Sequence, residues 1–252
     1  MKVFLLITLI SLLLGIGALP GQFDIAEGEV RIVGGNASTI EQFPYIAQLH
    51  LDNEFACGAC IISPKYMENI DNIILHVGTT KFDQTTTEAI TLAKVYIHPM
   101  YNDTTLDYDI SILLLNKDLV FGKRISSVPL PPPNVVLPAG TKAIVAGWGI
   151  LISRGNLPTK LQAVALPIIS NEECARRYVD SDETWVFDRN LCAGYEQGGK
   201  DACDGDSGGP LTVDGVLYGL VSSGIGCADG RYPGTYTSVS SLRSYIASVT
   251  GL

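Results

Sequence analysis

Short apolar stretches rich in Val, Ile, Leu and Thr recur along the whole chain, and turn residues separate them. This pattern predicts an all-β protein. Several stretches are too apolar for a sheet with one face in water, which indicates barrels or sandwiches. The strands that we expect span residues 45–51, 59–62, 73–77, 89–97, 110–115, 143–147, 161–168, 216–222 and 234–239.

Two helices and one long connection interrupt this pattern. The run Ser170-Asn171-Glu172-Glu173 predicts a short capped helix, because the serine hydroxyl can accept from a free backbone N–H of the first turn. A terminal helix is expected to pack on the body of the protein through Leu242, Tyr245, Ile246 and Val249, which share one face. Residues 128–140 contain five prolines and are therefore expected to connect two β halves.

The first residues have the order of a secretory signal. Lys2 precedes an apolar run from Val3 to Leu14, and small residues follow up to Ala18. We expect a signal over residues 1–18 that is removed, since the run is too short for a membrane span. The resulting protein is expected to be secreted and extracellular, without a membrane partner.

Composition and charge narrow the class of partner. The chain has 252 residues, of which 46% are hydrophobic, enough for one globular unit or two closely packed halves. Its net charge of −9 argues against nucleic acid or anionic lipid as a ligand. Two sequons, at Asn36 and Asn102, leave glycosylation open.

The run from Asp201 to Pro210 carries the most specific signal, because it embeds Ser207 among glycines. A nucleophilic serine needs an exposed hydroxyl and nearby backbone N–H groups that hold an oxyanion. On this motif the chain resembles the chymotrypsin family of serine proteases from Arg31 to the C-terminus, which implies that the N–H groups of Gly205 and Ser207 form the oxyanion hole. The resemblance implies two six-stranded antiparallel β-barrels with a C-terminal helix, and cleavage of peptide bonds.

The resemblance implies further roles at the start of the matching region. Arg31-Ile32-Val33-Gly34-Gly35 is similar to the family's activation site, so that residues 19–31 would be a propeptide and 32–252 the peptidase domain. An activating protease would cut after Arg31, and the new ammonium at Ile32 would pair with Asp206. A buried carboxylate is costly without such a partner, so this pairing would order the serine loop.

Two more aspartates match family positions. Asp109 resembles the aspartate that orients the catalytic histidine, and Ser222 the serine that hydrogen-bonds it. Asp201 resembles the carboxylate at the bottom of the specificity pocket of trypsin-like members, where it would favour an arginine or lysine side chain. The glycines that keep the pocket walls open are Gly224 and Gly234.

By the same resemblance, two further positions can be compared with family residues, one at the wall of the substrate cleft and one in a structural signature. Ser223 stands where the family usually has tryptophan, so one wall of the cleft is diminished. Trp148 matches a family signature and is expected to pack rather than bind.

The catalytic histidine is missing. Active relatives carry it in a Thr-Ala-Ala-His-Cys motif about fifteen residues after a Cys-Gly-Gly stretch, but the chain runs from Cys57-Gly58-Ala59-Cys60 to Asn69 without it. An internal deletion describes this best, because the flanks still match. The other histidines, His50, His76 and His98, lie in or beside predicted strands, where reach to Ser207 is not expected.

The cysteines also indicate that the segment with the catalytic histidine is missing. The resemblance implies the disulfides Cys174–Cys192 and Cys203–Cys227, which suit an oxidising compartment. Cys57 has lost its family partner, and Cys60 lies about 10 Å away along a strand, too far for a bridge without bending. No metal site or cofactor is expected, because no histidine cluster accompanies the pair.

The sequence leaves three hypotheses for the function open. The chain is an inactive or severely impaired protease homologue that acts by binding, an active trypsin-like endopeptidase with an incomplete sequence record, or an enzyme with an unorthodox base. The partners expected in each case are a protein or peptide with Arg or Lys, an activating protease and protease inhibitors. A monomer is expected.

Overall fold

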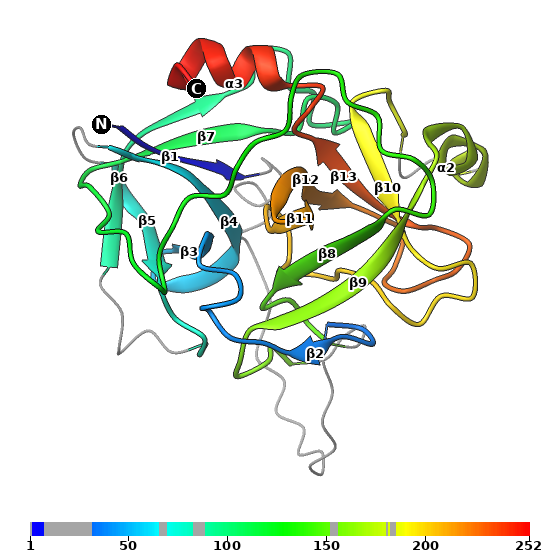
Figure 1. Cartoon of the computed structure of the whole chain (residues 1–252), viewed down its shortest axis with the longest axis horizontal. Helices are drawn as coiled ribbons and strands as arrows, with labels where there is room; N and C mark the ends of the chain where they lie inside the picture. The colour runs from blue at the N-terminus through cyan, green and yellow to red at the C-terminus, as the bar shows by residue number, and fades with distance from the viewer. Residues whose placement is uncertain are drawn as a thin grey trace.

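A computed structural model of the chain describes residues 2–7, 32–65, 70–82, 89–151, 156–179, 181 and 185–252. Two antiparallel β-barrels lie side by side, and a helix closes the C-terminal end (Figure 1). The all-β, two-barrel fold expected from the sequence is confirmed.

The first barrel is closed, in the strand order β1-β4-β3-β5-β6-β7. Its strands are β1 (Lys2–Ile7), β3 (Ile46–Leu51), β4 (Glu54–Lys65), β5 (Ile70–Val77), β6 (Ala89–Ile97) and β7 (Ser111–Leu115). Strand β6 has the predicted bounds. Strand β1 was not predicted as a strand: it lies in the segment that we assigned to a secretory signal, and it pairs with both β4 and β7.

The second sheet has the order β10-β13-β12-β11-β8-β9-β2. A further pairing of β10 with β9 closes six of these strands into a ring and leaves β2 outside it. These elements are β2 (Asn36–Ala37), β8 (Lys142–Gly147), β9 (Gln162–Ile169), β10 (Asn190–Ala193), β11 (Pro210–Val213), β12 (Val216–Ser223) and β13 (Gly234–Ser238). Strand β9 alternates buried and half-buried residues along its length, as expected of a strand with one face in a barrel core.

Both predicted helices are present. Helix α2 (Asn171–Tyr178) begins after Ser170, whose side chain accepts a hydrogen bond from the Glu173 backbone N–H at 3.2 Å. Helix α3 (Arg243–Thr250) ends at Gly251, which adopts φ +77°, and packs its buried Ile246 on the first barrel's core. None of the described helices is long and apolar enough to cross a membrane.

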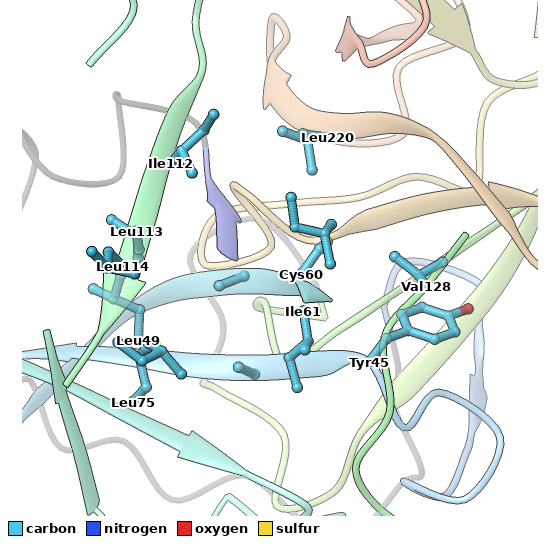
Figure 2. Close-up of a cluster of buried hydrophobic side chains, with 14 of the residues drawn as sticks. Tyr45, Leu49, Cys60, Ile61, Leu75, Ile112, Leu113, Leu114, Val128 and Leu220 are labelled. Carbon is cyan, nitrogen blue, oxygen red and sulfur yellow. The ribbon is translucent and has the colours of Figure 1, made fainter. Parts of the chain in front are cut away.

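Strand β4 links the first barrel to the second. It is longer than the predicted 59–62, because Gly58 continues the strand instead of ending it. A Cβ at Gly58 would lie 3.1 Å from the Gly209 backbone, so glycine allows the two barrels to approach closely here. Figure 2 shows Cys60 and Ile61 of β4 in the buried cluster, with Ile112, Leu113 and Leu114 of β7 (other labelled members are Tyr45, Leu49, Leu75, Val128 and Leu220).

The connection between the barrels contacts both of them. The Val128 N–H donates to the Ile61 carbonyl at 2.9 Å, and the Leu217 N–H donates to the Pro129 carbonyl at the same distance. Residues 128–140 contain no strand or helix, as their prolines predict. Trp148, at the end of β8, adds a bond from its indole N–H to the Thr80 carbonyl at 3.2 Å. These bonds hold the barrels in one relative position.

Candidate active site

Asp109 lies two residues before β7 and is almost completely buried. The Ser222 hydroxyl, from β12 of the other barrel, donates to its Oδ2 at 2.6 Å. The Thr237 hydroxyl donates to its backbone carbonyl at 2.8 Å. Two residues of the second barrel therefore fix Asp109 of the first, Ser222 through its carboxylate and Thr237 through its backbone, at the junction of the two halves.

The loop before Asp109 has an unusual backbone. Leu106 and Tyr108 both adopt positive φ, 55° and 54°. Residues other than glycine rarely occupy this region of backbone conformation. Arg189 holds this loop: its guanidinium makes two hydrogen bonds to Asp107, at 2.8 and 2.7 Å, and lies 4.3 Å from the centre of the Tyr108 ring. This side chain thus compensates a strained turn that positions Asp109.

Ser207 lies in a tight turn formed by residues 203–209. Gly205 and Gly208 adopt φ of 91° and 76°, which explains why the motif requires glycine there. The Gly58 N–H donates to the Ser207 carbonyl at 3.0 Å, so β4 of the first barrel supports the turn. The Ser207 side chain is half-buried and takes part in no hydrogen bond to another described residue.

Asp206 is fully buried beneath this turn. Its carboxyl accepts from the Gly149 N–H at 2.8 Å and from the Cys203 N–H at 3.0 Å. Burial raises the pKa of Asp206 to about 7, against the lowering effect of these two bonds. Ile32 is also fully buried, in the core of the second barrel. The uncut chain therefore holds a buried carboxyl that has no cationic partner among the described side chains.

Asp201 lines a pocket of about 80 Å³ together with Ser222, Gly224 and Gly234. Its carboxyl accepts from the Ala202 N–H at 2.8 Å and from the Ala228 N–H at 3.0 Å. Burial raises the pKa of Asp201 to about 7. Ser207 also lines this pocket, so the serine and Asp201 border one cavity.

Both expected disulfides are present. Cys174–Cys192 ties α2 to β10, and Cys203–Cys227 ties the serine loop to the pocket wall. Neither of them includes Cys57 or Cys60, which are buried on β4. The Cys60 thiol lies 3.5 Å from the Gly208 carbonyl, and burial raises its pKa well above the usual value.

Comparison with known proteins identifies the family. The profile of the trypsin family matches residues 32–246. The chain is 34% identical to Trypsin 5G1 of Aedes aegypti, over 88% of this chain and 86% of the relative. It is 36% identical to a vitellin-degrading protease of Bombyx mori (87% and 85% covered) and 35% identical to a trypsin of Xenopus laevis (88% and 91% covered).

The chain belongs to the trypsin family of serine proteases.

No histidine hydrogen-bonds Ser207 in the part of this family member that the structure describes. His98 accepts from the Met100 N–H at its Nδ1, and its ring is stacked on Tyr108 and tilted against Tyr245. His50 and His76 contact each other, with ring centres 4.7 Å apart, inside the first barrel. Burial lowers the pKa of all three, to about 4 for His50, and this favours the neutral imidazole.

Sequence reasoning missed some residues that shape the site. Gly226 lines the pocket with φ +67°, and its place beside Cys227 in a glycine-rich stretch was the only signal for it. Phe55 approaches Gly205 from the first barrel, because its ring carbon would lie 3.2 Å from a Cβ there. Thr235 also lines the pocket, and its hydroxyl lies 2.9 Å from that of Ser223, a residue that the sequence did single out.

Proposed function

We propose that this chain is a secreted trypsin-like protease homologue that binds arginine or lysine side chains of proteins but hydrolyses peptide bonds extremely slowly. One observation carries the proposal: the Asp201 pocket opens beside Ser207, yet no described histidine reaches this serine. The binding half of the site is thus present without its base.

The chemistry of acyl transfer explains the expected loss. The Ser207 hydroxyl must lose its proton as it attacks a carbonyl, and a neutral histidine within hydrogen-bond reach normally takes that proton. Asp109 serves to orient such a histidine, and Ser222 already occupies its Oδ2. Without the base, Ser207 is a weak nucleophile, and only oxyanion stabilisation by the Gly205 and Ser207 N–H groups and substrate binding contribute to the rate.

Activation is part of the proposal. Cleavage after Arg31 would create an ammonium at Ile32, and the buried Asp206 carboxyl is the partner that suits it. Pairing would favour the ionised form of Asp206 and would order the turn that carries Gly205 and Ser207. The raised pKa of Asp206 in the uncut chain supports this role.

Cation binding tests the pocket. The activated protein should bind p-aminobenzamidine, with an increase in ligand fluorescence, because its amidinium can pair with Asp201. Asp201→Ser should abolish this binding. Asp204→Ser is the matched control, since Asp204 also lines the pocket but is exposed. Equal affinity of the parent and Asp201→Ser would refute the pocket assignment.

Turnover tests the missing base. After cleavage at Arg31, arginyl ester hydrolysis should be no more than slightly faster than that of Ser207→Ala. Insertion of Val-Leu-Thr-Ala-Ala-His-Cys between Tyr66 and Met67 should restore it. Turnover of the parent at rates typical of trypsin-like enzymes, roughly 1 to 1000 per second, would show that another base serves Ser207.

A further inference from the structure

The turn between β6 and β7 carries one of the two sequons, Asn102-Asp103-Thr104. A backbone hydrogen bond closes this turn, because the Asn102 N–H donates to the Asp107 carbonyl at 3.1 Å. Asn102, Asp103 and Thr104 are all exposed. An acceptor asparagine is expected on a surface loop, because the attached oligosaccharide is bulky and hydrophilic. This sequon therefore has the structural setting that glycosylation requires.

The side chain of Asn102 has a defined orientation in this turn. Its Oδ1 accepts hydrogen bonds from the backbone N–H groups of Thr104, at 2.9 Å, and Thr105, at 3.0 Å. Only the oxygen of a carboxamide can accept, so these two donors determine which end of the amide faces the backbone. Nδ2 makes no hydrogen bond to another residue in the part of the chain that the structure describes. The atom that would carry a sugar is thus the one left to solvent.

An oligosaccharide on Nδ2 would preserve the turn. N-glycosylation replaces one hydrogen of Nδ2 and leaves both lone pairs of Oδ1 in place, so the bonds from Thr104 and Thr105 remain. The closing bond between Asn102 and Asp107 uses backbone atoms alone. The folded turn therefore loses no hydrogen bond when the sugar is attached.

The end of the turn is anchored to the body of the protein. The Arg189 guanidinium makes two hydrogen bonds to Asp107. The next residue, Tyr108, contacts this guanidinium at 4.3 Å from its ring centre and stacks on the His98 ring at 4.5 Å. A glycan at Asn102 would therefore have a defined position, on the same segment as Asp109.

The second sequon lies in a different setting. Asn36 belongs to β2, where it is paired with Ala163 of β9. A Cβ on the neighbouring Gly35 would lie 2.8 Å from the Ala163 carbonyl oxygen, so the backbone before Asn36 packs closely on the second barrel. Of the two sequons, the structure therefore favours Asn102 as the acceptor.

We propose that Asn102 is an N-glycosylation site of the secreted protein. Its Nδ2 attacks C1 of the first sugar of a lipid-linked diphosphate oligosaccharide, which the oligosaccharyltransferase of the secretory pathway supplies. The C1–Nδ2 bond forms, the bond from C1 to the diphosphate oxygen breaks, and one proton of Nδ2 passes to a base of the transferase. This inference rests on the secreted location in the proposed function, but it does not depend on the Asp201 pocket or on hydrolysis.

Mass spectrometry of the secreted protein tests the proposal. The full chain is expressed in insect cells, and the protein in the medium is treated with peptide N-glycosidase, which converts a glycosylated asparagine to aspartate. We expect this conversion at Asn102, and only after the treatment. Thr104→Ala should abolish it, whereas Thr104→Ser, which keeps the sequon, should retain it. Both variants keep the backbone N–H from which Asn102 accepts, so they form a matched pair.

Unmodified Asn102 in the secreted parent would overturn the proposal, and so would equal modification of the parent and Thr104→Ala. Asn36→Gln is a further control, because it removes the other sequon and should leave the modification of Asn102 unchanged.

Secretion and glycosylation are measured separately. Absence of the protein from the medium would contradict the secreted location in the proposed function. In that case a signal sequence established for the host is fused ahead of Met1, and Asn102 is analysed in the protein that this leader directs into the secretory pathway. Modification of Asn102 in that protein would support the proposal, and its absence would overturn it.

Discussion

Ser222 of one barrel donates a 2.6 Å hydrogen bond to Asp109 of the other, and both residues are buried. Ser222→Ala would leave a buried carboxylate with one bond fewer, so we expect a loss of about 1.5–3 kcal/mol in the free energy of unfolding. Ser223→Ala is the control, because its hydroxyl bonds the neutral Thr235 hydroxyl and should cost about 0.5–1.5 kcal/mol. Urea unfolding measures both. A smaller loss for Ser222→Ala than for Ser223→Ala would contradict this assignment.

Asp206 should make the uncut chain less stable as the pH rises. Its pKa is about 7 in the folded chain and near 3.8 without burial. The unfolded chain therefore releases this proton first, so the stabilisation is complete below pH 4 and is lost as the pH rises through 7. Relative to Asp206→Asn, the parent should lose roughly 4 kcal/mol at most over this range.

Urea midpoints of parent and Asp206→Asn at several pH values between 4 and 8 provide the measurement. Subtracting the variant removes the titration of other carboxyls. After cleavage at Arg31 the difference should disappear or change sign, because an ammonium at Ile32 would favour the carboxylate. A pH-independent difference in the uncut chain would show that Asp206 is already paired.

The two pocket glycines should respond differently to alanine. A Cβ at Gly234 would lie 2.7 Å from the Asp201 carboxyl, whereas the nearest atom to a Cβ at Gly224 is 3.8 Å away. Gly234→Ala should therefore destabilise the fold by about 1–3 kcal/mol through overpacking, and Gly224→Ala by much less. Thermal unfolding of both variants tests this, and equal losses would show that the pocket wall yields at Gly234.

Arg189 should contribute to stability through geometry rather than charge alone. Arg189→Lys keeps the charge but loses the paired hydrogen bonds to Asp107 and the flat contact with Tyr108, so we expect a loss of about 1–2 kcal/mol. Arg231→Lys is the matched control, because its pair with Asp229 is exposed and worth little. Urea unfolding compares the two, and identical effects would mean that the turn before Asp109 does not depend on Arg189.

The spacing of apolar residues predicted a strand well where one face of that strand lies in a barrel core. Strand β6 has its predicted bounds, and β12 differs by one residue. The short strands β10 and β11 were missed, because Asn190–Ala193 and Pro210–Val213 are too brief to show alternation. Strand β1 was missed for another reason: a continuous apolar run near the N-terminus is typical of a signal, and its pairing with β4 and β7 is not visible in the sequence.

Some features of the candidate site could likewise be predicted from the sequence, and others could not. Ser207, Asp201 and the disulfide cysteines stand in motifs whose spacing is visible in the sequence, and the two disulfides are confirmed. The bonds from Arg189 to Asp107, in the turn before Asp109, could not be predicted, because 82 residues separate the two partners. Contacts between barrels depend on tertiary packing, which leaves no local pattern.

The two tryptophans of the protein report on different parts of it. Trp148 is 1% exposed and bonds the Thr80 carbonyl across the two barrels, whereas Trp185 is 43% exposed. Trp148 should therefore emit in the blue while the barrels are docked, and its emission should shift to the red when they separate. Replacing Trp185 with Phe would leave an intrinsic fluorophore at the junction, through which separation of the barrels can be followed in real time without any label.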